Sequence, residues 1–367
     1  MNFEFSEEQQ FIREQARSFL ARECSTAAVR EILDGGQPFH RPLWEKMVGL
    51  GWTAMAIPEE HGGLGLGYLE LCVIAEELGR ALAPVPFSSS VYLATEAIKR
   101  WGSPEQKAAY LPGLASGELI GCFAHAEGPG LPAVNATSSE GSVSGCKLPV
   151  ADGDSADFAV LSARGADQAV QLFLVDLEQP GVTRETLTSM DPSRSQARLD
   201  LQQASAQPLG AAAAADEEAI NTLLDGAAVL LAFEQIGGCQ AAMDSGIAYT
   251  KQRYAFGRPI ASFQAIKHKF ADMFVALELA RSNAYYGAWA LSSDSPDLPL
   301  AAATARVSAT DAYYLISKEN IQAHGGMGFT WEFDCHLYYR RAQLLSSQLG
   351  TMPWWKERLV SNLLHAA

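Results

Sequence analysis

The sequence is poor in positive charge and has no compositional bias of the kind seen in disordered or fibrous chains. Its 367 residues carry 27 Lys and Arg against 42 Asp and Glu, a formal net charge of −15. Such a balance repels phosphate backbones and anionic lipids, which argues against nucleic acid or a membrane surface as the main partner. Hydrophobic residues make up 48% and charged residues 19%. These fractions are typical of globular chains, and the length indicates two or three domains.

Paired cysteines, metal-ligand motifs and long apolar runs are also missing. The six cysteines are scattered without a CxxC pair, which favours reduced, mostly buried thiols. The histidines lack metal-ligand spacing and no HExxH occurs, so we expect no metal site. The apolar run Ala227 to Phe233 is far shorter than the roughly 20 residues that cross a bilayer. Because the start is acidic where a signal peptide would be basic, we expect a cytoplasmic protein without a transmembrane helix.

Helical patterns dominate the first third of the chain. Ser6 and Ser103 each open a Ser-x-x-Gln sequence, which predicts a capping box at a helix start. Amphipathic spacing predicts another helix over Tyr68 to Ala81, and the Gly-rich segment 58–67 before it is expected to be a loop. We therefore assign residues 1–115 to an N-terminal all-helical domain.

The hydrophobic period changes to two residues near Leu119. Four runs with this period are separated by turns rich in Gly, Asp and Ser: 119–126, 142–150, 157–163 and 169–177. Alternation of this kind is typical of antiparallel strands. Residues 116–212 are therefore predicted to form a small middle β domain.

Long helical stretches return after the β region. Asp216 to Arg253 and Phe263 to Ser292 are the longest, and helices of this length with short connections favour a bundle. We assign residues 213–367 to a C-terminal helix bundle, entered through the Ala-rich linker 211–215. The expected fold class is mostly α with a central antiparallel β domain.

Two generic motifs are better explained as turns. Gly128 to Ala133 matches a dinucleotide fingerprint in letters, but it contains two prolines and no helical pattern follows it. Gly141 to Gly145 resembles a nucleophile elbow, yet its serines miss the central position. Neither motif is expected to carry function.

Three C-terminal segments are more specific when they are taken together. They are RYAFGRPI at 253–260, FQAIKHKFADM at 263–273 and QAHGGMGF at 322–329. With the loop 58–67 and the helix that ends in Tyr110-Leu111-Pro112, they resemble the acyl-CoA dehydrogenase family, in the same order over nearly the whole chain. The resemblance implies the three-part fold deduced above, FAD as cofactor, an acyl-CoA thioester as substrate, and an electron-transferring flavoprotein as acceptor.

The resemblance implies that two chains share each flavin, as they do in this family. One chain supplies the β-domain wall and the catalytic carboxylate, and its neighbour supplies contacts to pyrophosphate and adenine. This chain keeps the neighbour's half, with the expected cofactor-binding residues Arg253, Phe256, Gly257, Gln264, Gln322, Gly325 and Gly326. Singly, a surface arginine or a helix C-terminus would explain such residues equally well. Together, and in the same order along the chain as in the family, the Arg253 guanidinium and the backbone N–H groups of the Gly325-Gly326 turn favour a flavin site.

The other half of the site departs from the family pattern. The family's Tyr-x-x-Thr-Glu-Pro strand falls on Phe123 to Gly128, which lacks the Thr hydroxyl. The Trp-Ile-Thr segment falls on Pro149 to Ala151, which lacks the ring and the hydroxyl, and proline has no N–H to donate. We expect the flavin wall of this chain to be eroded.

Neither position at which the family carries its catalytic base holds an acidic residue in this chain. Removal of the α-proton of a thioester needs a positioned carboxylate. The Glu of the family's Glu-Gly-Thr triplet falls on Leu349, and the alternative location falls on Ala227. Glu234 and Asp225 lie near the second location, but a helix carboxylate paired with Arg or Lys is the simpler interpretation of each. Glu332 and Glu357 are expected to be exposed helix charges. The imidazoles of His268 and His324 could act as bases at neutral pH, but His324 is expected to hydrogen-bond either a cofactor or a backbone group.

The sequence therefore predicts no catalytic residue and a chain that completes another subunit's flavin site. It resembles the partner subunit of heteromeric (two plus two) acyl-CoA dehydrogenases, which handle bulky thioesters such as steroid side-chain CoA esters. The second subunit would carry the Glu. Three alternatives stay open: a self-sufficient homomer with a base such as Glu234, a non-catalytic scaffold or acyl-binding subunit, and a flavin monooxygenase relative.

Overall fold

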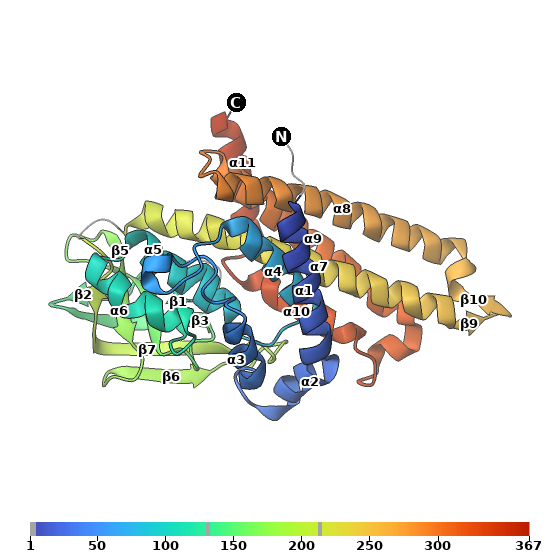
Figure 1. The fold of residues 1–367 in the computed structure, drawn as a ribbon, viewed down its shortest axis with the longest axis horizontal. Coiled ribbons are helices and arrows are strands. Elements are labelled where there is room, and N and C mark those ends of the chain that lie inside the picture. Colours follow the sequence, from blue (N-terminus) through green and yellow to red (C-terminus); the bar gives the residue numbers. More distant parts are fainter. Residues whose placement is uncertain (1–4, 130–132, 212–214, 367) are drawn as a thin grey trace.

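Helices, a sheet and helices again follow one another along the chain in the computed structural model, which describes residues 5–129, 133–211 and 215–366 (Figure 1). The predicted turn at 128–133 and the linker at 211–215 lie partly outside the described residues. One continuous apolar core runs through all three regions.

The N-terminal region is helical, as predicted. Its elements are α1 (Glu7–Glu23), α2 (Thr26–Gly35), α3 (Arg41–Gly49), η1 (Glu59–His61), α4 (Tyr68–Arg80), η2 (Ser88–Thr95), α5 (Glu96–Trp101) and α6 (Pro104–Ala115). The capping boxes at Ser6 and Ser103 are confirmed, since each serine accepts a hydrogen bond from the backbone of the glutamine three residues later. The predicted loop 58–67 contains only the short turn η1.

The middle region is a sheet curled against η2 and α6. Its strands are β1 (Gly121–Ala124), β2 (Thr137–Ser139), β3 (Ser142–Ala151), β4 (Phe158–Arg164), β5 (Val170–Asp176), β6 (Val182–Thr186), β7 (Gln196–Ser205) and β8 (Gln207–Pro208). The strand order is β6-β7-β3-β2-β4-β5-β8, with β1 against β4. Most pairs are antiparallel, but β1 and β2 run parallel to β4. Periodicity alone does not distinguish the two pairings, because the chain's connections decide strand direction.

Long helices make up the C-terminal region. Its elements are α7 (Glu217–Gln252), β9 (Tyr254–Ala255), β10 (Arg258–Pro259), η3 (Ile260–Ser262), α8 (Gln264–Ser292), α9 (Leu298–His324), η4 (Gly325–Phe329), α10 (Cys335–Ser347) and α11 (Met352–Ala366). The domain boundaries near 116 and 212 stay a prediction. They fall where helices give way to strands, between Ala115 and Gly121, and where strands give way to α7.

The central helix α7 is covered on most sides. By length and apolar composition it is the one helix among the described residues that could span a membrane, yet 83% of its most apolar window is buried within the protein. Helix α4 crosses it with the two backbones in contact. A Cβ at Gly79 would lie 1.8 Å from the carbonyl oxygen of Glu234, and one at Gly237 would lie 1.8 Å from that of Glu76. Glycine at both positions therefore allows the backbone of α4 to pack directly against that of α7.

Candidate active site and cofactor interface

Helix α7 separates the two halves of the predicted site. Ala227 lies near its beginning, and Arg253 follows 26 residues later, just beyond its end. At 1.5 Å per helical residue, the two are separated by roughly 39 Å. Figure 1 shows the sheet beside one end of α7 and the β9–β10 hairpin at the other. The two halves of one chain therefore do not meet in a common site.

A cavity of about 300 Å³ lies where the first half of the site is expected. Ala227 of α7 and Leu349, in the loop after α10, both line it, so the two base positions face the same space. Neither side chain can accept a proton. Among the residues that the structure describes, none of those lining the cavity carries a charged side chain.

The β-domain wall lines the same cavity. Phe123, Ala126, Pro149 and Ala151 all contact it. Methyl groups at Ala126 and Ala151 stand where the resemblance implies hydroxyls, and Pro149 provides no backbone donor. These wall residues therefore do not fit a flavin ring, because they offer it no hydroxyl and Pro149 has no N–H.

A buried polar network lies against one wall of the cavity. The Lys147 ammonium is fully buried and donates hydrogen bonds to Glu127 Oε1 at 2.6 Å and to Ser162 Oγ at 3.1 Å. Ser162 Oγ lies 2.9 Å from His125 Nδ1, and His125 lines the cavity. Burial lowers the pKa of His125 to about 4, and the Lys147 charge acts in the same direction. The imidazole is therefore neutral at physiological pH.

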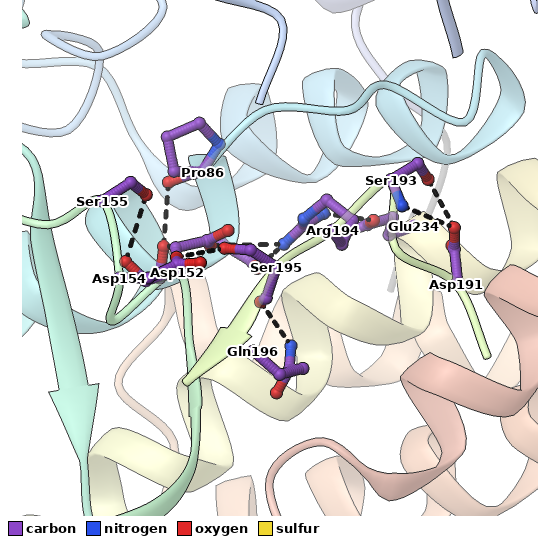
Figure 2. Close-up of polar contacts among 12 residues, drawn as sticks. Pro86, Asp152, Asp154, Ser155, Asp191, Ser193, Arg194, Ser195, Gln196 and Glu234 are labelled. Atoms are coloured by element: carbon purple, nitrogen blue, oxygen red, sulfur yellow. Dashed lines mark hydrogen bonds and ion pairs between the residues drawn. The ribbon is translucent and has the colours of Figure 1, made fainter. Parts of the chain in front are cut away.

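Glu234 belongs to a buried ion-pair cluster and does not line the cavity. Its Oε1 lies 3.2 Å from Nη1 of Arg194 (Figure 2). The same oxygen lies 3.7 Å from Nη1 of Arg341. Arg194 also hydrogen-bonds to Ser88, and Arg341 hydrogen-bonds to Asp191 at 2.6 Å. The expected pairing of Glu234 with arginine is confirmed. The cluster joins η2, the segment before β7, α7 and α10.

The other candidate acids and histidines are also structural or exposed. Asp225 is buried and accepts two hydrogen bonds from Arg358; burial raises its pKa. Glu332 and Glu357 are exposed, as predicted, and His268 is exposed as well.

His324 takes the backbone alternative that the sequence left open. It is buried, and its Nδ1 lies 2.8 Å from the carbonyl oxygen of Asn320. Burial lowers its pKa.

The second half of the predicted site is an exposed surface at the far end of the bundle. Phe256 and Gly257 form the two-residue turn of the β9–β10 hairpin, with φ angles of 52° and 76°. Positive φ at both positions is typical of a type I′ turn and favours glycine at the second. Phe256 is 96% exposed. Arg253 is exposed too, and its guanidinium has no ion-pair partner among the described residues.

The end of α9 lies beside this hairpin. Tyr249 in the last turn of α7 stacks on His324 at a ring distance of 4.1 Å. Gln322, Gly325 and Gly326 are therefore next to the Arg253 segment, and all three are exposed, as is Gln264 at the start of α8. The structure thus places the seven expected cofactor-binding residues on one solvent-facing end. Their groups suit a dinucleotide, since a guanidinium fork and free N–H groups bind phosphate oxygens.

Thiol and metal chemistry find no support in the described residues. Five of the six cysteines are buried, and Cys146 is half-buried; none is paired with another. No group of three or more His, Cys, Asp or Glu side chains within 5–129, 133–211 and 215–366 could hold a metal ion.

Comparisons with known proteins point to one family. Residues 6–118 match the model of the acyl-CoA dehydrogenase N-terminal domain, and residues 217–354 match that of the C-terminal domain. The acyl-CoA dehydrogenase IpdE2 of Mycobacterium tuberculosis is 34% identical, over 93% of this chain and 94% of its own. The human mitochondrial short-chain specific acyl-CoA dehydrogenase is 32% identical, over 99% and 92%.

Solved structures share the whole fold. A chain of the ChsE4-ChsE5 complex from Mycobacterium tuberculosis is 27% identical, with a TM-score of 0.91 over 99% of both chains. A chain of the Tcur3481-Tcur3483 steroid ACAD is 29% identical, with a TM-score of 0.89 over 98% of both.

Proposed function

Because the chain belongs to the acyl-CoA dehydrogenase family, whose cofactor is FAD, we propose that it completes the flavin site of a second, related subunit and has no catalytic base of its own. The observation that carries this proposal is the contrast between the two ends of α7. One end faces an uncharged cavity at both base positions, and the other presents unpaired, exposed groups suited to a dinucleotide.

Residues at the exposed end would hold the cofactor of the partner. Arg253 would bind the pyrophosphate with its guanidinium fork, and the turn at Gly325-Gly326 would offer backbone N–H groups. Phe256, Gly257, Gln264 and Gln322 would complete the contact surface. When bound, FAD accepts the hydride that leaves the β-carbon of the acyl thioester.

The second subunit would supply the carboxylate that removes the α-proton. Two relatives support a heteromeric assembly and a bulky substrate: one is named as a complex of two chains, and the other as a steroid ACAD. We therefore infer that the complex forms an enoyl-CoA from a bulky acyl-CoA such as a steroid side-chain ester. An electron-transferring flavoprotein as acceptor and a cytoplasmic location stay predictions.

Purification of the chain alone and with its partner tests the proposal. The lone chain is expected to retain little flavin and to dehydrogenate no acyl-CoA. Co-expression with a family member that carries the Glu is expected to give a yellow, active complex with one flavin for every two chains. Stoichiometric flavin and turnover in the lone chain would instead establish the homomeric alternative.

Glu234→Gln separates the same two hypotheses within the assembled complex. Its carboxylate is held between two guanidinium groups outside the cavity, so turnover is expected to stay near normal once the complex is assembled. Loss of the chemical step with flavin still bound would show that Glu234 is a base and that the proposed roles are wrong. A scaffold without a flavin role would leave the family-ordered set around Arg253 without a task. A monooxygenase would need an intact flavin wall in its own chain, and the wall of this chain lacks the expected groups.

A further inference from the structure

The cavity around Ala227 has no task in the proposed function, although it keeps the size of a small ligand site. Its volume of about 300 Å³ is at the lower end of the range for ligand pockets. Leu224, Leu231 and Leu349 contribute to its apolar lining. Because no Lys or Arg lines it within the described ranges, it offers no cation to a phosphate, a carboxylate or the CoA moiety. Its chemistry suits an uncharged, apolar molecule.

One wall of this cavity carries a histidine whose tautomer is determined by its neighbours. The Lys147 ammonium donates to Ser162 Oγ, so this oxygen already serves as an acceptor. The Ser162 hydroxyl is fully buried, and within the described residues the only acceptor recorded for its hydrogen is His125 Nδ1. A buried donor without an acceptor is costly. We therefore assign the ring proton of His125 to Nε2.

This network also keeps the histidine neutral. The charged groups that face it are Lys147 from β3 and Glu127 from the segment after β1. They pair with each other at 2.6 Å, and Glu127 further accepts hydrogen bonds from the backbone N–H groups of Asn135 and Ala136. Burial and the Lys147 charge both disfavour a second proton on the ring. A neutral imidazole that carries its hydrogen on Nε2 is a hydrogen-bond donor without a charge.

Tyr92 also lines the cavity and carries an unsatisfied hydroxyl. Its side chain lines the cavity and is 2% exposed. Its hydroxyl has no hydrogen-bond partner among the described residues. A buried hydroxyl without a partner destabilises a protein unless something else satisfies it.

We propose that this cavity is a binding site for a small, uncharged, apolar molecule with one acceptor oxygen, such as a ketone, and that the His125 Nε2–H donates to that oxygen. The site goes beyond the proposed function, because it needs neither flavin nor a base. It lies in the cavity lined by the two base positions, Ala227 and Leu349.

Titration of the assembled complex with cyclooctanone tests this site. Calorimetry would measure its affinity, and the infrared carbonyl stretch of the bound ketone would report the hydrogen bond. Saturable binding with a stretch shifted to lower frequency is expected. His125→Phe should weaken binding roughly 5- to 10-fold and remove the shift, as expected for one hydrogen bond. Ala227→Leu, which fills the cavity, should abolish binding.

His61→Phe is the matched control, because His61 lies in the loop 58–67 outside the cavity lining. The flavin content of each complex reports its assembly, so a misfolded variant is recognised. The proposal is overturned if the wild-type complex shows no saturable binding, or if either cavity variant binds cyclooctanone like the wild type. Flavin-binding and turnover tests of the lone chain are independent of these results, so a failure here is distinguishable from a failure of the proposed function.

Discussion

The two ends of α7 differ in exposure, in charge and in their relation to a second chain. At the Ala227 end, three regions of the same chain line the cavity, and none of the described lining residues is charged. At the Arg253 end, the residues project from the bundle and have few contacts of their own. Because roughly 39 Å of helix separates them, substitutions at one end leave the other unchanged. A chain can therefore lose its own catalytic site while keeping the surface that another chain's site requires.

The comparison also separates the buried charges of α7 from the exposed charge beyond its end. Glu234 and Asp225 lie on the same helix as Ala227, and both are satisfied by arginines from distant parts of the sequence. These pairs bind the regions of the protein to one another. We expect substitutions there to change the free energy of unfolding, and substitutions at the exposed end to change flavin binding.

The largest effect is expected for Arg194→Met. Arg194 is 2% exposed, and its removal leaves Glu234 with the more distant Arg341 as its only cation within the described part of the chain. Removal of one partner of a buried ion pair typically lowers the free energy of unfolding by about 3–5 kcal/mol. Urea unfolding of the chain would measure the loss. Arg198→Met is the control, since its partner Asp200 is on the surface, where an ion pair contributes little to stability. Equal effects of the two substitutions would contradict the structural role of the cluster.

Arg253→Ala should be the next largest and should act on flavin alone. A charge-assisted contact to phosphate contributes about 1.5–3 kcal/mol, so FAD affinity of the assembled complex should fall roughly 10- to 150-fold. Unfolding of the lone chain should hardly change, because the guanidinium has no ion-pair partner among the described residues. Equilibrium dialysis would measure the cofactor. Arg22→Ala, at an exposed arginine of α1, should retain flavin; if Arg253→Ala does so as well, the half-site model is wrong.

A smaller effect concerns pH and the cavity end. The pKa of His125 lies near 4 in the folded chain, below its ordinary value of about 6.5. Above pH 6.5 both states are neutral, so the stability is complete. As pH falls from about 6.5 to 4, the unfolded chain binds a proton that the folded chain does not, and stability is lost. About 2 kcal/mol of this loss is expected to have accumulated by pH 5, and it should be absent from His125→Gln. Parallel pH profiles of urea unfolding for the two proteins would contradict the assignment.

The smallest effect, none at all, is expected for Leu349→Glu in the lone chain. The substitution restores a carboxylate at the family's base position, but Ala126, Pro149 and Ala151 still lack the groups of a flavin wall. An assay with an acyl-CoA and an artificial electron acceptor should detect no dehydrogenation. Activity in this variant would show that the cavity end lost only its base.

Local pattern was sufficient for most of the secondary structure. The capping boxes at Ser6 and Ser103 predicted helix starts to the residue, because a cap depends on side chains within one turn. The long stretch from 216 to 253 is α7, within one residue at each end. The strand β7 was missed, although Ala197, Leu199 and Leu201 alternate as buried residues along it. That alternation was the signal that could have found it.

The sequence by itself determined the order of helices and strands, the loss of acids at Leu349 and Ala227, and the survival of the Arg253 and Gly325 segments. Each of these depends on residue identity or on neighbours within a few positions. Only the tertiary structure decided that Leu349 and Ala227 face one cavity. It also decided that Arg194 and Arg341 pair with Glu234. In the same way, it placed Ser162 where it hydrogen-bonds to both His125 and Lys147. These contacts join residues far apart in the chain, and their geometry follows from the packing of the whole core, which no local spacing specifies.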